Sequence, residues 1–443
     1  MRVLLVSWEY PPVVVGGLGR HVHHLALQLR DLGHDVVVLS RQPTGTDPRS
    51  NPTTDQRIDD VRVIMAAEDP LALDFGTDMM PWVLSMGHAM LRAGLRLAGF
   101  NPTAGEDALH GAGNVGRPWV PDVVHAHDWL AAHAAVGLAE AFDAPLVATV
   151  HATEAGRHSG WVSGPVNRQV HSTEWWLANE ADAVITCSRS MSDEVNRLFG
   201  PGLAQLHVIA NGIDATQWPY RDRARTSSGA GGFAARHGAP PRLLYVGRLE
   251  YEKGVQDLIA ALARVRRTHP GTTLTVAGDG TQASWLREVA REHRVLRAVE
   301  FTGALDHEEL VAQLHSADAL VIPSRYEPFG IVALEGGATG IPVVATTAGG
   351  LADFIRTGDT GASVPPADVP ALTAAIRGVL DDPETAHSGA RAARAEVEEL
   401  TWEAVANETV QVYLAAKRRP RNPLGRRVID ERPLPERDPT NPL

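Results

Sequence analysis

The chain of 443 residues carries a formal net charge of −12, with 21% charged and 44% hydrophobic residues. That length predicts at least two domains, and the acidic balance argues against a general nucleic-acid or anionic-membrane binder. The single cysteine, Cys187, allows no intrachain disulfide and no cysteine-based zinc site, which is typical of a cytoplasmic protein. No apolar stretch is long enough to cross a bilayer, so we expect no integral membrane segment.

Short apolar runs alternate with longer helical patterns in the first half of the chain. The runs are apolar throughout, as expected for parallel strands that are covered on both faces. They lie at 3–7, 35–40, 61–66, 122–127, 145–151 and 182–188, with helical patterns such as 19–33 and 160–181 between them. The segments 41–60 and 101–121 are predicted to be irregular. The alternation predicts a doubly wound α/β sheet.

A second series of apolar runs repeats the pattern. Its members lie at 242–249, 273–280, 298–305, 317–324, 341–348 and 360–366. The polar segment 221–241 between the two series, rich in Gly, Ser, Ala and Arg, is predicted to be a mobile connection. We therefore predict Rossmann-like domains over 1–215 and 216–400, a helix over 401–417 that docks back on the first domain, and a disordered tail over 418–443.

A glycine-rich turn follows the first predicted strand. Gly16, Gly17 and Gly19 open a helix, but the third glycine of the dinucleotide fingerprint is absent, and so is the lysine of a P-loop. Backbone N–H groups at such a turn can hold a phosphate or a carboxylate. Tight packing of the strand against the helix explains the glycines equally well.

Two cations follow the first strand of the second series. Arg248 and Lys253 lie just beyond its carboxyl end, the edge at which open α/β sheets bind ligands. Their charge suits a diphosphate, whereas the simpler interpretation is two solvated surface charges.

The stretch 323–351 contains two glutamates eight positions apart, Glu327 and Glu335, around Phe329 and Gly330. Glu327 is expected in a loop, and Glu335 on a helix opened by Gly330. Both carboxylates can then face one cleft and accept hydrogen bonds from sugar or ribose hydroxyls. The alternative is an exposed helix with two ordinary acids.

The histidines do not have the spacing of a metal site. The run 123–133 departs from the metallo-hydrolase pattern, and the histidines at positions 21, 23 and 24 share a helix without a partner motif. His151 ends a predicted strand and is placed to touch a ligand, although such a histidine is more often structural. We predict that no metal is bound.

Taken together, these features resemble the retaining GT-B glycosyltransferases that include bacterial glycogen synthases and sucrose synthases. The features are Gly16-Gly17, the run "HAHDW", His151, the Arg248–Lys253 pair and the two glutamates, and the resemblance extends from residue 1 to about 417. The stretches 6–25 and 151–164 resemble the mycobacterial α-(1→4)-glucosyltransferases of methylglucose lipopolysaccharide and glycogen assembly. One departure is Val14, which stands where glycogen synthases usually carry lysine.

The resemblance implies a GT-B fold and transfer of glucose from UDP- or ADP-glucose onto an α-(1→4)-glucan, without a metal or other cofactor. It implies a catalytic set, a donor-binding set and one acceptor-side residue. The catalytic set is His151, Arg248, Lys253 and Glu327; the donor set is Gly16, Gly17, Arg248, Lys253, Glu327, Phe329, Gly330 and Glu335; the acceptor-side residue is Asp128.

Three other functions stay open at this point. A related transferase could make a different glycoside or a mannoside, because variable loops read the acceptor. An NAD(P)-dependent oxidoreductase is disfavoured by the incomplete glycine fingerprint, and a non-catalytic nucleotide-sugar sensor by the intact cation pair. The preferred nucleotide, the acceptor length and the oligomeric state are not encoded in these motifs.

Overall fold

The computed structural model describes residues 1–13, 16–43, 47, 49–67, 73, 77–99, 118–158, 160–200, 203, 205–222 and 239–416. The tail over 418–443 lies outside the described residues, as do Val14 and most of the segments 101–121 and 221–241. The predictions of disorder and mobility for those segments therefore stay predictions.

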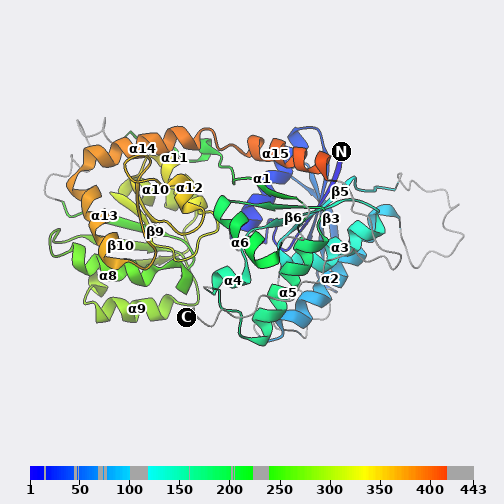
Figure 1. Cartoon of the computed structure of the whole chain (residues 1–443), viewed down its shortest axis with the longest axis horizontal. Coiled ribbons are helices and arrows are strands. Elements are labelled where there is room, and N and C mark those ends of the chain that lie inside the picture. Colours follow the sequence, from blue (N-terminus) through cyan, green and yellow to red (C-terminus); the bar gives the residue numbers. More distant parts are fainter. Residues whose placement is uncertain are drawn as a thin grey trace, which may run out of the picture.

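Two sheets flanked by helices form the fold, one in each half of the chain (Figure 1). The first has the strand order β3-β4-β2-β1-β5-β6-β7-β8, and the second has the order β11-β10-β9-β12-β13-β14. Every described pairing is parallel except the one between β3 and β4. The predicted fold class, α/β with two doubly wound parallel sheets, is confirmed.

The strands of the first sheet are β1 (Arg2–Ser7), β2 (Asp35–Arg41), β3 (Thr54–Ile58), β4 (Val61–Ala66), β5 (Val123–His127), β6 (Leu146–Val150), β7 (Ala183–Thr186) and β8 (Leu206–Val208). Those of the second are β9 (Arg242–Val246), β10 (Thr273–Ala277), β11 (Val299–Gly303), β12 (Ala319–Ile322), β13 (Val343–Thr346) and β14 (Ala362–Val364).

The helices of the first half are α1 (Gly17–Asp31), α2 (Met79–Leu95), α3 (Ala132–Ala141), α4 (Glu154–Arg157), α5 (Pro165–Glu180) and α6 (Arg189–Phe199). Those that follow are α8 (Val255–Val265), α9 (Ala283–Glu292), α10 (His307–Ser316), α11 (Ile331–Thr339), α12 (Leu351–Phe354), α13 (Val369–Asp381), α14 (Pro383–Val397) and α15 (Trp402–Ala415). Helix α5 begins at Pro165, later than the predicted start at residue 160, because proline is favoured in the first turn of a helix.

The sequence pattern missed two strands, the short β8 and the edge strand β3. The segment 41–60 was predicted to be irregular, but it contains β3, which pairs antiparallel with β4 at the sheet edge. The middle residues of β3 are exposed and polar, so the strand has no hydrophobic alternation to reveal it. An ion pair between Asp55 and Arg62, 2.6 Å apart, helps to hold it in place.

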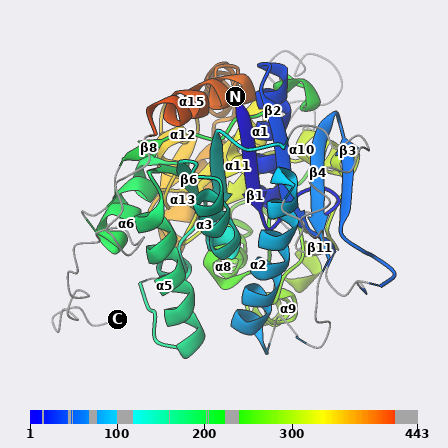
Figure 2. The same ribbon diagram turned by 90° about the vertical axis from the view of Figure 1, so that its right-hand side faces the viewer.

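Both faces of the first sheet are buried, which explains why its strands are apolar throughout. Along β1, Leu4 and Val6 pack into one cluster with α2, α3 and α5, whereas Val3 and Leu5 pack into another with α1 and α15. Figure 2 shows α2, α3 and α5 in front of this sheet and α15 above it. Successive side chains of a strand point to opposite faces, so each residue of β1 has an apolar neighbour.

The last described helix crosses back to the first half of the chain (Figure 1). Trp402, Val405 and Tyr413 of α15 are buried in the same cluster as β1 and α1. The Tyr413 hydroxyl also lies 2.7 Å from Nδ1 of His125, inside the sheet. Residues after the second sheet therefore complete the core of the first.

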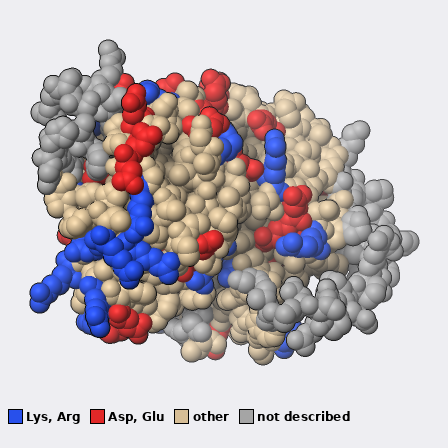
Figure 3. Space-filling model, turned by 60° about the vertical axis from the view of Figure 1, so that its left-hand side comes forward, with Lys and Arg blue, Asp and Glu red and all other residues tan. Residues whose placement is uncertain are grey.

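The surface charge is uneven. Figure 3 shows a dense group of Lys and Arg side chains at the lower left of the face in view, while further basic and acidic side chains are scattered over the rest of that face. Among the helices that the structure describes, none is both long and apolar enough to cross a membrane.

Replacement of Trp402 by alanine tests the role of α15. Trp402 is 6% exposed, and loss of a buried tryptophan of this kind costs about 3–5 kcal/mol. We expect the free energy of unfolding to fall by that amount in urea denaturation followed by circular dichroism. Leu414→Ala is the control on the same helix, since Leu414 is 63% exposed. Equal stability of the two variants would contradict a core role for α15.

Candidate active site

Two of the predicted residues meet at the carboxyl edge of the first sheet. Asp128 follows β5 and His151 follows β6, and these strands are neighbours. The backbone N–H of His151 donates to Oδ1 of Asp128 over 2.7 Å. Asp128 has a positive φ of 61°, and burial raises the pKa of its carboxyl to about 6. The Asp128 side chain therefore shapes the loop that carries His151.

Three histidines come together behind this edge. His21 of α1, His127 and His151 each bring a ring nitrogen within 4.8 Å of the others. Nδ1 of His127 lies 3.2 Å from Nε2 of His151, and Nδ1 of His21 lies 2.7 Å from Oδ1 of Asn211. The sequence contained no partner motif for His21, because its proximity to His127 and His151 depends on strand order and on the placement of α1.

The histidine cluster is uncharged near neutral pH. Burial lowers the pKa of His21 to about 3 and that of His151 to about 4, and it holds the pKa of His127 well below the usual value. Neutral imidazoles are zinc ligands, and the ring nitrogens of His21, His127 and His151 all lie within 4.8 Å of one another, so this group could hold a metal ion. Two of its members, His127 and His151, are hydrogen-bonded to each other, and His151 is the half-buried member of the group.

On the second sheet, Lys253 and Glu327 form an ion pair. Lys253 follows β9 and Glu327 follows β12, its neighbour in the sheet. Nζ of Lys253 lies 2.9 Å from Oε2 of Glu327, which also accepts a hydrogen bond from the hydroxyl of Ser324 at 3.0 Å. The gap between β9 and β12 is the point where the strand order reverses, the usual ligand site of such sheets.

Arg248 lies in the same loop but is held less tightly. Its side chain is 50% exposed, and one guanidinium nitrogen lies 3.4 Å from Oε1 of Glu252. The loop itself is fixed at Gly254, which has a φ of 70° and would bring a Cβ to 1.9 Å from the carbonyl oxygen of Pro323. Close packing at Gly254 therefore fixes the backbone at the end of this loop, whereas the side chain of Arg248 is half exposed to solvent.

The loop of Glu327 is braced by close backbone packing. A Cβ at Gly349 would lie 2.0 Å from the carbonyl oxygen of Glu327, and the N–H of Gly350 donates to that oxygen at 3.0 Å. Phe329 packs between the apolar clusters of both halves. Gly330 has a φ of 95° and precedes α11, as the sequence predicted.

The two predicted glutamates have different partners. Glu327 pairs with Lys253, whereas Oε1 of Glu335 lies 2.7 Å from Nη1 of Arg20, in the first turn of α1. A Cβ at Gly17 would lie 3.3 Å from the Cδ1 methyl of Ile331, and the N–H of Gly16 donates to Glu9 at 3.1 Å. The start of α1 thus lies against the start of α11, and one of its N–H groups is already occupied.

Further residues at this junction were missed by sequence reasoning. The hydroxyl of Tyr326 lies 3.0 Å from Oε1 of Glu194 and accepts from the N–H of Thr153 at 3.2 Å. The hydroxyl of Ser188 donates to the carbonyl of Pro328 at 2.7 Å. These partners are more than 130 residues apart, so no local pattern could have linked them.

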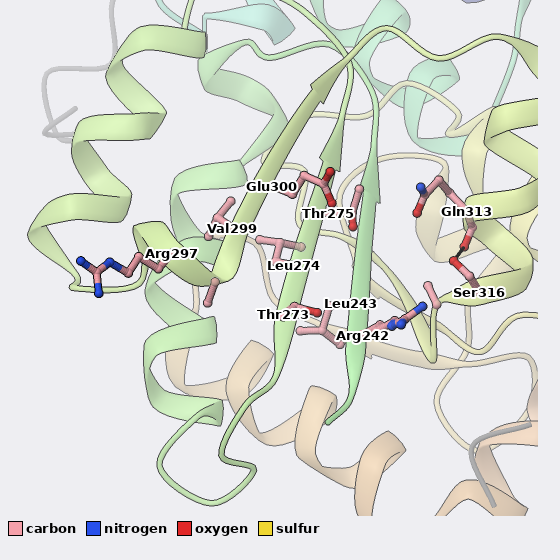
Figure 4. Close-up of a pocket in the computed structure, with 12 residues that line it drawn as sticks. Arg242, Leu243, Thr273, Leu274, Thr275, Arg297, Val299, Glu300, Gln313 and Ser316 are labelled. Carbon is pink, nitrogen blue, oxygen red and sulfur yellow. Dashed lines mark hydrogen bonds between the residues drawn. The ribbon is translucent and has the colours of Figure 1, made fainter. Parts of the chain in front are cut away.

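A cavity of about 480 Å³ lies elsewhere, at the opposite edge of the second sheet (Figure 4). It is lined by residues at the amino ends of β9, β10 and β11 and by Gln313 and Ser316 of α10. Arg242 and Thr273 begin their strands there. Because open α/β sheets bind ligands at the carboxyl edge, this cavity is separate from the candidate site.

Two doubly wound sheets, with cationic, acidic and imidazole groups at their carboxyl edges, define a GT-B glycosyltransferase. The family model "Glycosyl transferases group 1" matches residues 234–396, and the model "Starch synthase catalytic domain" matches residues 2–208.

The relatives agree with that class. A glycogen synthase of Mycobacterium tuberculosis is 59% identical over 99% of this chain and 100% of its own. An MMP alpha-(1->4)-mannosyltransferase of Mycolicibacterium hassiacum is 30% identical, with 93% and 98% covered. The structure of sucrose-phosphate synthase from Thermosynechococcus elongatus is 26% identical with a TM-score of 0.73, covering 94% of this chain and 98% of its own. The chain belongs to the glycosyltransferase family that includes this glycogen synthase, and it is an enzyme of the hexosyltransferase class.

The buried histidines predict acid instability. Burial lowers the pKa of several imidazoles, most strongly those of His21, His24, His125, His127 and His151, so these groups bind fewer protons in the folded protein than in the unfolded chain below pH 6.5. Their contribution to stability is present above pH 6.5 and is lost as the pH falls. Burial raises the pKa values of Asp128 and Glu174, so at these two groups the folded protein binds more protons than the unfolded chain. These two protons oppose the loss of stability that the histidines cause at low pH.

We therefore expect the free energy of unfolding to decrease from pH 6.5 to pH 4.5. His24→Asn should reduce that slope by about one proton, because the folded protein no longer excludes a proton at this position. Urea titrations at several pH values measure the slope, with exposed His293→Asn as the control. A slope that His24→Asn leaves unchanged would contradict the assignment.

Proposed function

We propose that this protein is a retaining glucosyltransferase that moves glucose from UDP- or ADP-glucose onto an α-(1→4)-glucan. The observation that carries the proposal is the meeting of two carboxyl edges, one with Asp128 and His151 and the other with Lys253, Glu327 and Glu335. The full-length similarity to a glycogen synthase supports the glucan acceptor. The proposed role is in methylglucose lipopolysaccharide or glycogen synthesis, and the name of this relative supports glycogen synthesis.

The donor occupies the switch point of the second sheet. Arg248 and Lys253 neutralise the diphosphate, where negative charge grows as the glycosidic bond breaks. The ion pair of Lys253 with Glu327 then holds the glutamate beside the sugar, whose hydroxyls donate to its carboxylate. Glu335 accepts hydrogen bonds from the ribose, and the Gly16–Gly17 turn approaches the phosphates from the first sheet.

The acceptor reaches the sugar from the side of Asp128 and His151. Since no described side chain at the site is an evident covalent nucleophile, an acceptor hydroxyl attacks the anomeric carbon on the face from which the diphosphate leaves. The bond from that carbon to the phosphate oxygen breaks, and the leaving diphosphate takes the acceptor proton. Neutral His151 accepts or donates a hydrogen bond at the sugar, and the configuration is retained.

The alternative is that the protein makes a different glycoside. The 30% identity to a mannosyltransferase favours a mannoside as that alternative product. The deciding experiment incubates the protein with UDP-, ADP- and GDP-sugars and short α-(1→4)-glucans. We expect glucose to be added in an α-(1→4) linkage. Transfer of mannose alone, or no transfer to any glucan, would overturn the proposal.

Removal of either diphosphate-binding cation should slow transfer strongly. We expect Arg248→Ala and Lys253→Ala to lower turnover about a hundredfold or more, since each removes charge stabilisation from the transition state. Turnover at saturating donor measures the effect. Arg291→Ala, which removes an exposed arginine next to Glu288, is the matched control. Turnover close to that of the native chain in both site variants would refute the diphosphate assignment.

Activity should not depend on a metal ion. The cationic side chains supply the charge that Mg²⁺ supplies in other transferases, so we expect the transfer rate to be unchanged in excess EDTA. The measurement compares initial rates with and without chelator. Complete loss of activity, restored by Mg²⁺ or Mn²⁺, would mean that a metal site exists.

A further inference from the structure

The ion pair of Arg20 with Glu335 joins the two halves of the chain at the candidate donor site. Nη1 of Arg20 lies 2.7 Å from Oε1 of Glu335, although the residues are 315 positions apart. The side chain of Glu335 is 2% exposed, whereas that of Arg20 is 45% exposed. A buried carboxylate is costly without a charged partner, and Arg20 provides that partner for Glu335.

The contact engages only one oxygen of the carboxylate. Within the described part of the chain, Arg20 is the side chain that donates to Oε1, and no group donates to Oε2. A carboxylate oxygen can accept more than one hydrogen bond, so Oε2 is available to the hydroxyls of a ribose. The arginine thus fixes the orientation of the carboxylate without using all of its acceptor capacity.

The position of Arg20 on its helix is itself unfavourable. It lies in the first turn of α1, where the helix dipole disfavours a positive charge and where no acidic residue compensates. Glu335, from the other half of the chain, provides the compensation. An arginine in this place is therefore better explained by the contact it makes across the site than by the stability of α1.

We propose that Arg20 is a positioning residue for the donor nucleotide. It holds the Glu335 carboxylate so that Oε2 meets the ribose hydroxyls, and it makes nucleotide binding by the second sheet depend on a residue of the first. This inference rests on the proposed role of Glu335 toward a nucleoside diphosphate sugar. Because the probe is nucleotide binding, it is tested separately from the identity of the acceptor.

The experiment compares Arg20→Met, Arg20→Lys and the native full-length chain by calorimetry with UDP, ADP and their 2′-deoxy and 3′-deoxy analogues. A hydrogen bond to a charged group changes affinity by about 10- to 100-fold, so the native chain should prefer the ribonucleotide by that factor. Arg20→Met should weaken binding and reduce the preference to about threefold or less. Arg20→Lys should restore part of the preference, because it keeps the charge but not the geometry.

Two further variants separate positioning from a merely structural contact. Glu335→Gln should remove the ribose preference, and Arg20→Met should add little to that loss, because both act through one carboxylate. Arg197→Met replaces an exposed arginine on α6 and should leave binding unchanged.

Three results would overturn the proposal. If Arg20→Met melts at a lower temperature but keeps native affinity and preference, the pair is only structural. If it binds nucleotide more tightly, Arg20 competes with the ribose. If the native chain does not distinguish ribose from deoxyribose, Glu335 does not bind the ribose. Absence of glucan transfer with an intact ribose preference would instead contradict the proposed acceptor alone.

Discussion

Parallel strand pairing is the constraint on which the rest of this structure depends. In each sheet the parallel strands end at one edge, so loops that are distant in the sequence collect there. Asp128 meets His151 because β5 and β6 are neighbours, and Lys253 meets Glu327 because β9 and β12 are neighbours. The same pairing requires helical crossovers on both faces of each sheet. Because these helices bury the strands on both faces, the strand residues are apolar throughout.

The junction of the halves is made by the same loops that carry the candidate chemistry. Arg20 pairs with Glu335, Tyr326 contacts Glu194, and Ser188 donates to the carbonyl of Pro328. Relative movement of the halves would therefore change the surroundings of the reacting groups directly. Helix α15 adds a second connection, since it carries the chain from the second sheet to the core of the first.

The carboxyl edges of the two sheets differ in the partners that stabilise their polar side chains. On the first sheet, burial leaves the histidine cluster uncharged. His127 pairs with His151 and His21 pairs with Asn211, but Nε2 of His127 has no hydrogen-bond partner among the described residues. On the second sheet, each of the two glutamates forms an ion pair with a cation, Glu327 with Lys253 and Glu335 with Arg20. A neutral edge facing a charged edge suits a reaction in which charge grows on a leaving diphosphate while an uncharged hydroxyl approaches from the other side.

The sequence by itself determined the apolar strands, the turn at Gly330 and the positions of Glu327, Glu335 and Lys253, because periodicity and backbone conformation are local properties. It did not reveal β3, whose exposed polar residues have no pattern. Nor could it pair Arg20 with Glu335 or gather His21 with His127, since those contacts follow from strand order and from how the halves pack. Local sequence sets which groups stand at a strand end, and only the tertiary structure decides which of them meet, because each meeting depends on apolar packing over hundreds of residues.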